Sequence, residues 1–186
     1  MNMHDLVVKH ALNAKKAARK MALLDANLKN HALERMADAL IRSTEMIISE
    51  NDKDMEKGRR QGLSDALLDR LMLNRDRIQD MALGLRQVAA LKDPVGEGTR
   101  TWTGADGIRI TQIRTPIGVV GMIYEARPNV TVDAAALCLK SGNAVILKGG
   151  LEAIHSNTAI AGVIEEAAVA AGLPVGCIQC VESTDR

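Results

Sequence analysis

Residues 115–150 constrain the fold of this 186-residue chain more than any other segment, because strand-like and helix-like patterns alternate there. Residues 117–124 are a nearly continuous apolar run, which is typical of a parallel strand buried on both faces. Residues 130–139 have helical composition and end before Gly142, and a second apolar run covers residues 144–147. Strand, polar turn, helix and strand in this order predict an α/β sheet that binds ligands at the carboxyl ends of its strands.

The same alternation continues toward the last residue. Apolar residues recur at helical spacing from Ile160 to Ala171, and a third strand is expected over residues 177–181. Right-handed crossovers would bring the three strands into one parallel sheet. We therefore predict a Rossmann-like βαβαβ core over residues 115–186.

Residues 1–95 predict a layer of amphipathic helices that belongs to the same domain. Val7 and Ala11 begin a repeat of apolar residues every three or four positions, and similar stripes recur farther along. Such stripes are the ordinary signature of packing and indicate core rather than a ligand site. Asn74 is placed to cap the last of these helices. Residues 53–62 are strongly charged and end on glycine, so we expect a solvated connector there.

Residues 96–114 differ in texture, with Thr, Gly and alternating apolar and polar positions. The turn sequence GADG at residues 104–107 predicts a protruding β-hairpin. An isolated hairpin is only marginally stable in water, so it needs a surface to pack on. The sequence alone allows this hairpin to pack on its own domain.

Composition narrows the classes of function. The 24 basic and 23 acidic residues are interspersed and leave a net charge of +1, so no broad field favours nucleic acid or an anionic membrane. Trp102 and Tyr124 are the only aromatic residues, which argues against the stacking platforms of single-strand binders. The N-terminal segment is too charged for a secretory signal, and no apolar run approaches the roughly 20 residues of a membrane helix. We expect a cytoplasmic protein.

The three cysteines raise the question of a redox or metal site. Cys177 and Cys180 have the CxxC spacing of a thioredoxin-like pair or of half a zinc site. Residues three apart in a strand face opposite sides of the sheet, and the sequence has no second CxxC to complete a metal site. Cys138 lies among apolar residues of a predicted helix. We expect buried thiols and no metal.

Three motifs carry a resemblance to a known family: EARPNVTVD from Glu125, LCLKSGNAVILKGG ending at Gly150, and QGLSDALLDRL at residues 61–71. From its first helix to its last residue the chain resembles the gamma-glutamyl phosphate reductases, or glutamate-5-semialdehyde dehydrogenases, of the aldehyde dehydrogenase superfamily. The resemblance implies NADPH-dependent reduction of L-glutamyl 5-phosphate to L-glutamate 5-semialdehyde, with release of phosphate. It also implies a cytoplasmic step of proline biosynthesis.

The resemblance has further implications for partners and for the extent of the chain. It implies a homo-oligomer in which the hairpin at 96–114 is an oligomerisation arm with Trp102 at a subunit contact. It also implies coupling to the glutamate kinase that makes the acyl phosphate. Family members continue into a domain with a nucleophilic cysteine, and this chain stops at Arg186 before it. We expect a cofactor-binding part that shows no turnover by itself.

The resemblance places NADP at the carboxyl ends of the first two strands. Lys148 resembles the superfamily lysine that contacts the adenosine ribose, and its charge would favour a 2′-phosphate. The two glycines after it would let a ligand approach the backbone. The expected cofactor-binding residues are Ile123, Tyr124, Glu125, Ala126, Lys148, Gly149 and Gly150.

In the superfamily, the turn after the first strand carries an asparagine whose amide stabilises an oxyanion. An ungapped alignment puts Arg127 at that position, and Asn129 lies two residues later. Arg127 could equally hold an acyl phosphate or carboxylate through its fork of donors, and Asn129 could cap the following helix. We take Asn129 as the candidate oxyanion donor and Arg127 as the candidate substrate-binding residue, and their roles are exchangeable at this stage.

Two other functions remain open from the sequence. A protein that is complete at 186 residues would have to be a non-catalytic dinucleotide-binding or scaffolding module. A fragment of a general aldehyde dehydrogenase, which oxidises aldehydes with NAD, is the second alternative. The EARPN motif and the motif at residues 61–71 weigh against that second reading.

Overall fold

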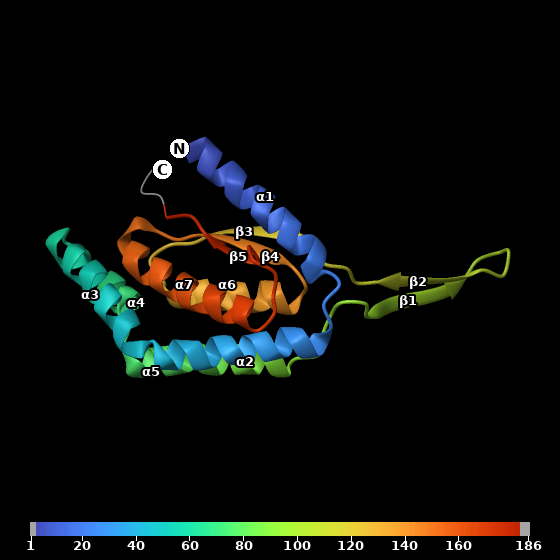
Figure 1. Cartoon of the computed structure of the whole chain (residues 1–186), viewed down its shortest axis with the longest axis horizontal. Helices are drawn as coiled ribbons and strands as arrows, with labels where there is room; N and C mark the ends of the chain where they lie inside the picture. The colour runs from blue at the N-terminus through green and yellow to red at the C-terminus, as the bar shows by residue number, and fades with distance from the viewer. Residues whose placement is uncertain (1–2, 183–186) are drawn as a thin grey trace.

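The computed structural model of the chain describes residues 3–182 and confirms an α/β fold with a parallel sheet (Figure 1). Residues 1–2 and the last four residues of the predicted core, 183–186, lie outside the described residues. The sheet consists of β3 (Val119–Ile123), β4 (Ala144–Lys148) and β5 (Ile178–Cys180), in that order, and both strand pairs are parallel. The predicted βαβαβ unit is therefore present.

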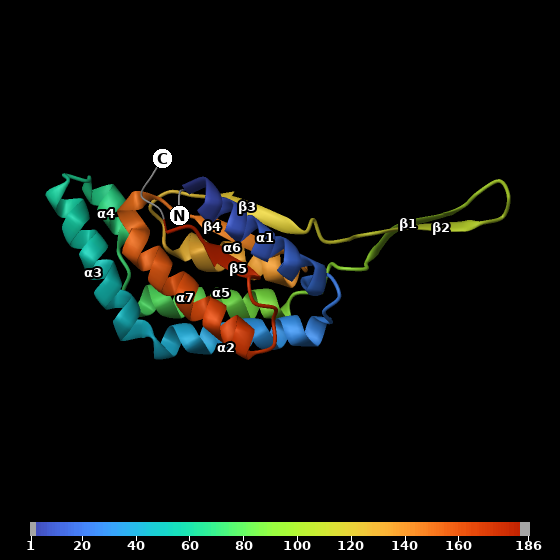
Figure 2. The same cartoon turned by 45° about the horizontal axis from the view of Figure 1, so that its top comes forward.

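Helices cover both faces of this sheet (Figures 1 and 2). On one face lies α1 (Met3–Met21), and on the other lie α6 (Asn129–Lys140) and α7 (Ile154–Ala170), which follows a short 3₁₀ turn, η1 (Leu151–Ala153). The sheet thus separates α1 from the other N-terminal helices, so residues 1–95 do not form one continuous layer. No helix within residues 3–182 is long and apolar enough to cross a membrane.

The remaining helices form an outer layer and one end of the molecule. α2 (Ala26–Arg42) and α5 (Arg75–Ala90) pack together and cover the outer side of α6 and α7. α3 (Thr44–Arg60) and α4 (Asp65–Leu71) lie at the end opposite the hairpin (Figure 1). The main core fills the space between the sheet, α6, α7 and the outer pair, and its fully buried side chains include Leu33, Met36, Leu85, Leu139 and Leu147.

The hairpin of β1 (Gly98–Thr103) and β2 (Arg109–Ile113) extends away from the rest of the molecule (Figures 1 and 2). The strands are antiparallel, with Trp102 opposite Ile110, and every residue of both strands is exposed. The guanidinium of Arg100 lies 5.3 Å from the centroid of the Trp102 ring. The predicted hairpin is confirmed, and the interpretation that it packs on its own domain is wrong.

The prediction of a solvated connector at residues 53–62 is also wrong, because α3 runs without a break to Arg60. Most of its charged residues occupy the outer face, while Asn51, Asp54 and Met55 are buried on the inner face. A Cβ atom on Gly58 would lie 3.0 Å from Cδ1 of Leu63, so glycine allows the helix to approach the following loop closely. The polar residues Asn51 and Asp54 interrupt the apolar repeat that would have indicated a helix. Both form hydrogen bonds with residues of other elements.

The expectation that the first strand is buried on both faces is wrong for this part of the protein. Within residues 3–182, β3 pairs only with β4 and forms the edge of the sheet. Ile123 is 86% exposed, whereas Val119 and Val120 pack against the core. An apolar run does not distinguish an edge strand from a central one, because the same β-branched and aliphatic residues favour strand formation at both positions.

Candidate functional site

The turn at residues 124–128, between β3 and α6, separates two pockets. Ile123 and Lys148 are register partners, so β3 and β4 end side by side at one edge of the sheet. The backbone N–H of Tyr124 donates to the carbonyl of Lys148 at 3.1 Å, and the N–H of Arg127 donates to the carbonyl of Glu125 at 2.8 Å. Residues 123–126 line one of these pockets, and residues 127–129 line the other.

The first pocket, which we call the strand-end pocket, has a volume of about 440 Å³ and lies at the carboxyl ends of β3 and β4. Lys148 supplies a cation there, Glu125 and Glu152 supply acceptors, and Leu63 and Leu67 supply an aliphatic wall from outside the sheet. The structure brings all the predicted cofactor-binding residues into this one pocket: Ile123, Tyr124, Glu125, Ala126, Lys148, Gly149 and Gly150.

The two glycines after Lys148 have a packing role. A Cβ atom on Gly149 would lie 2.1 Å from Nδ2 of Asn157, and one on Gly150 would lie 2.4 Å from Oε2 of Glu152. These are separations that real Cβ atoms do not reach. A side chain at position 149 would have to displace the buried amide of Asn157, whereas at position 150 the flexible carboxylate of Glu152 can move away, so close packing requires glycine at position 149. The approach of a ligand to this backbone stays a prediction.

A buried series of hydrogen bonds connects the end of β3 to the two helices α6 and α7. Oη of Tyr124 and Oγ1 of Thr131 are 2.7 Å apart, and Oγ1 of Thr131 donates to Oδ1 of Asn157 at 3.1 Å. Burial raises the pKa of Tyr124 to about 12. Nδ2 of Asn157 is buried and has no hydrogen-bond acceptor among the described residues. These hydrogen bonds hold the turn after β3 against α6 and α7.

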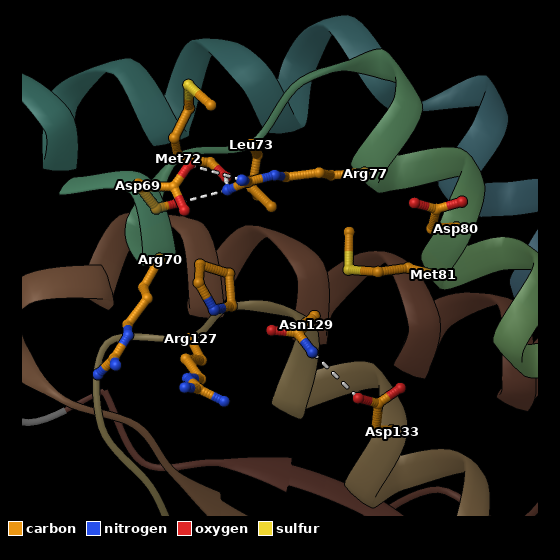
Figure 3. A pocket seen from close by; sticks show the side chains of 11 residues that line it. Asp69, Arg70, Met72, Leu73, Arg77, Asp80, Met81, Arg127, Asn129 and Asp133 are labelled. Atoms are coloured by element: carbon orange, nitrogen blue, oxygen red, sulfur yellow. Dashed lines mark hydrogen bonds and ion pairs between the residues drawn. The ribbon is translucent and has the colours of Figure 1, made fainter. Parts of the chain in front are cut away.

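The second pocket, which we call the charged pocket, has a volume of about 370 Å³ and lies between α4, α5 and the start of α6 (Figure 3). It contains both residues expected at the reacting group, Arg127 and Asn129. Its full lining is Asp69, Arg70, Met72, Leu73, Arg77, Asp80, Met81, Arg127, Pro128, Asn129 and Asp133.

The structure distinguishes the two candidate donors. Asn129 is the first residue of α6, and its Nδ2 donates to Oδ2 of Asp133 at 3.2 Å; Pro128 occupies the cap position, so the reading of Asn129 as a cap is wrong. Burial raises the pKa of Asp133, and the bond from Asn129 opposes that rise. No residue within 3–182 forms a hydrogen bond or an ion pair with the guanidinium of Arg127. All five of its N–H donors are open to a ligand.

Sequence reasoning missed the contribution of α4 and α5 to this pocket. Nη2 of Arg77 donates to Oδ1 of Asp69 at 2.8 Å, and Nη1 donates to the carbonyl of Met72 at 2.9 Å, which fixes the start of α5 against the end of α4. Arg70 lies beside this link on the pocket wall. The motif at residues 61–71 was a signal for these residues, but a charged face on a short helix looks like ordinary solvated surface.

Asn51 on α3 connects the charged pocket to α7. Its Nδ2 donates to the carbonyl of Leu71 at 2.9 Å and to Oγ of Ser156 at 3.0 Å, while the N–H of Leu73 donates to its Oδ1 at 2.8 Å. Asn51 is 1% exposed, so the three bonds are shielded from water. This side chain fixes the segment that leads from α4 into α5.

Asp54, one turn further along α3, caps α7 from outside that helix. Its carboxylate accepts from the N–H of His155 at 3.2 Å, from the N–H of Ser156 at 2.8 Å and from Oγ of Ser156 at 2.7 Å. A carboxylate at this place also interacts favourably with the helix dipole. Because Asp54 occupies these N–H groups, they are not available to a ligand phosphate, and the positive charge of the strand-end pocket comes from Lys148.

None of the cysteines lines either pocket, although Cys180 interacts electrostatically with Tyr124 and Lys148 of the strand-end pocket. Cys138 and Cys177 are buried as predicted, and Cys180 is half-buried. Burial raises the pKa of Cys177 to about 12 and that of Cys180 to about 11, and it also raises the pKa of Cys138. Across residues 3–182 no three His, Cys, Asp or Glu side chains are grouped to hold a metal ion. These thiols are poor nucleophiles in their present environments.

Comparisons with known proteins agree with this geometry. Gamma-glutamyl phosphate reductase of Clostridium novyi is 58% identical over all 186 residues of this chain, which cover 45% of that protein. Among solved structures, gamma-glutamyl phosphate reductase of Thermotoga maritima matches with a TM-score of 0.93 and 40% identity over 96% of this chain and 43% of that one. The enzyme of Saccharomyces cerevisiae matches with a TM-score of 0.89 and 34% identity over 95% of this chain and 46% of that one.

The chain thus spans less than half the length of these relatives. The family model described as the aldehyde dehydrogenase family matches residues 4–186. The chain belongs to the aldehyde dehydrogenase family.

Proposed function

We propose that this chain is the cofactor-binding part of an NADPH-dependent gamma-glutamyl phosphate reductase. In this proposal the enzyme converts L-glutamyl 5-phosphate to L-glutamate 5-semialdehyde and releases phosphate, as a step of proline biosynthesis. The names of the relatives support the proposal. The structural observation that carries it is the turn at 124–128, which separates a pocket containing Lys148 from a pocket containing Arg127.

The donors and acceptors of the strand-end pocket fit the adenosine end of NADPH. The ammonium of Lys148 would pair with the 2′-phosphate, and the carboxylates of Glu125 and Glu152 would accept hydrogen bonds from ribose hydroxyls. The aliphatic wall of Leu63 and Leu67 suits the less polar parts of the cofactor. Bound NADPH would supply the hydride, and the residues of this chain would hold and orient the cofactor.

The charged pocket would receive the reacting end of the substrate. One N–H of the Asn129 amide already bonds Asp133, and its second N–H is available for an oxyanion that develops at the acyl carbon. The guanidinium of Arg127 would bind the acyl phosphate through two parallel hydrogen bonds. These roles follow our assignment of Asn129 as the oxyanion donor and Arg127 as the substrate-binding residue.

The proposed reaction also needs a thiolate that attacks the acyl carbon and displaces phosphate. The thiols of Cys138, Cys177 and Cys180 lie outside both pockets and have raised pKa values. We therefore assign the nucleophile to the part of the relatives that this chain does not cover, and we expect the chain alone to be inactive. The exposed hairpin would serve as the arm of a homo-oligomer, and a glutamate kinase would supply the acyl phosphate in the cytoplasm.

The experiment uses the complete reductase, meaning this chain continued to the length of its curated relatives. With L-glutamate 5-semialdehyde and inorganic phosphate, the complete reductase should reduce NADP⁺, and the 186-residue chain should not. Titration of the chain with NADPH, followed by nicotinamide fluorescence, measures cofactor binding without turnover. A complete protein that binds neither NADPH nor NADP⁺ and shows no turnover would contradict the proposal. Turnover by the 186-residue chain alone would contradict the assignment of the nucleophile.

A further inference from the structure

The charged pocket has an internal charge separation that extends beyond the proposed roles of Arg127 and Asn129. Arg77 and Asp69 neutralise each other through their ion pair at 2.8 Å. Four charged lining residues remain after that pair is set aside: Arg70, Asp80, Arg127 and Asp133. No residue within 3–182 forms a hydrogen bond or an ion pair with the side chain of Arg70, Arg127 or Asp80.

These four charges are sorted by sign (Figure 3). Arg70 from α4 and Arg127 from the turn before α6 lie at one end of the pocket. Neither forms an ion pair with a carboxylate within residues 3–182, and Asp69 at the same end is paired with Arg77. Asp80 from α5 and Asp133 from α6 lie at the other end, and Asn129 lies between the two groups. Each pair of like charges comes from two different elements, so the sorting is a property of the assembled pocket.

We propose that the charged pocket recognises a zwitterionic amino-acid acyl phosphate, with Arg70 and Arg127 binding its phosphate and Asp80 and Asp133 binding its α-ammonium group. This inference rests on the proposed function, which supplies the substrate, and it adds Arg70, Asp80 and Asp133 as residues that determine specificity. It predicts that the amino group contributes to recognition, although it does not take part in the chemistry.

The dimensions of the pocket agree with such a substrate. Nδ2 of Asn129, the candidate oxyanion donor, lies 3.2 Å from Oδ2 of Asp133, so ligand groups bound to the two side chains would be near neighbours. In an extended glutamyl chain, four bonds of about 1.5 Å separate the acyl carbon from the α-nitrogen, a span of ~5 Å. With the acyl carbon at Asn129, the ammonium group therefore reaches the neighbourhood of Asp133.

The electrostatics at each end favour the same orientation. Burial raises the pKa of Asp133, and its only hydrogen-bond partner among the described residues is a neutral amide, so a bound cation would replace lost solvation. At the other end, two guanidinium groups can share the oxygens of a phosphate dianion through charge-assisted hydrogen bonds. The reverse orientation would bring the phosphate next to two carboxylates.

Steady-state kinetics of the complete reductase test this inference. In the oxidising direction, with NADP⁺ saturating, inorganic phosphate and L-glutamate 5-semialdehyde are varied separately. Arg70→Gln should raise the KM for phosphate about tenfold or more, because charge-assisted hydrogen bonds are lost, and should change the KM for the semialdehyde little. Arg70→Lys, which keeps the charge but lacks the fork, should restore part of the loss. Arg60→Gln, on the exposed face of α3, is the matched control.

The ammonium end is tested with a substrate that lacks the amino group, glutarate semialdehyde. Asp133→Asn should lower kcat/KM for L-glutamate 5-semialdehyde about tenfold and leave kcat/KM for glutarate semialdehyde nearly unchanged. Asp52→Asn on α3 is the matched control. Thermal unfolding and NADPH affinity should not change in either pocket variant, which establishes that each variant is folded.

Three outcomes overturn the inference. If Arg70→Gln raises the KM of both aldehydes but not that of phosphate, the arginine pair binds the α-carboxylate instead. If Asp133→Asn lowers kcat/KM equally for both aldehydes, the carboxylate does not recognise the ammonium group. If the wild-type complete protein is active and neither substitution changes its kinetics, the charge separation has no role in recognition. An inactive wild-type protein would instead contradict the proposed function.

Discussion

The strand-end pocket and the charged pocket lie on opposite sides of one turn, yet they are built in different ways. The first is formed mainly by two segments, residues 123–126 and 148–152, which the sheet register brings together. The second is formed by α4, α5 and the start of α6, which side-chain links hold in place. The shape of the first pocket therefore depends on backbone geometry, and that of the second depends on a few polar side chains.

The largest expected effect concerns what both pockets lack in this chain, a reactive thiol. Raising a thiol pKa from 9.0 to about 11, as burial does for Cys180, lowers its thiolate fraction near pH 8 about a hundredfold. Alkylation of Cys180 by iodoacetamide should be slower by about that factor in the native chain than in the unfolded chain. The rate should increase with pH through the alkaline range. A thiol of the native chain that reacts rapidly at neutral pH would contradict the conclusion that this part of the protein lacks a reactive nucleophile.

The second prediction concerns the cap that α3 supplies to α7. Asp54→Ala leaves the N–H groups of His155 and Ser156 without their acceptor, and Ser156 is fully buried, so the free energy of unfolding should fall by about 3 kcal/mol. Chemical denaturation measures this change. Asp52→Ala, on the exposed face of the same helix, is the control and should have little effect. If the two variants are equally stable, the cap on α7 is not a major support of the fold.

The third prediction tests whether the strand-end pocket binds the 2′-phosphate of NADPH. If Lys148 pairs with the 2′-phosphate, Lys148→Ala in the complete reductase should weaken NADPH binding about tenfold or more, and NADH binding less. Fluorescence titration at moderate salt measures both, because high salt would screen the difference. Lys53→Ala on α3 is the control. Equal losses for both cofactors would mean that Lys148 contacts the ribose or shapes the strand end.

The smallest expected effect is confined to the charged pocket. Oδ1 of Asn74 accepts from the N–H of Arg77 at 2.8 Å and caps α5. Asn74→Ala should reduce stability by about 1 kcal/mol and loosen the first turn of α5, which carries Arg77. Hydrogen exchange should accelerate at the start of α5 and remain unchanged at the ends of β3 and β4. Faster exchange at both pockets would show that they are less independent than their construction suggests.

The same difference explains how far the sequence predicted the site. The cofactor-binding residues predicted at the strand ends all line one pocket, because two parallel strands with a helical crossover must end at the same edge. The cap by Asn74 was also predictable, since a cap is a local interaction between residues three apart. Arg70 was missed, because the sequence of a short charged helix does not indicate which other elements the helix will contact.

The sequence by itself determined the α/β order, the hairpin, the strand ends and the limits of some helices, because hydrophobic periodicity and turn chemistry act over a few residues. Tertiary structure alone decided that Asn51 and Asp54 are buried, that β3 lies at the edge within the described residues, and that four charges sort by sign across one pocket. Those properties depend on partners 20 to about 100 residues away in the chain. Local patterns do not encode such partners, since the free energy of a buried polar group depends on which acceptor or donor the fold brings to it.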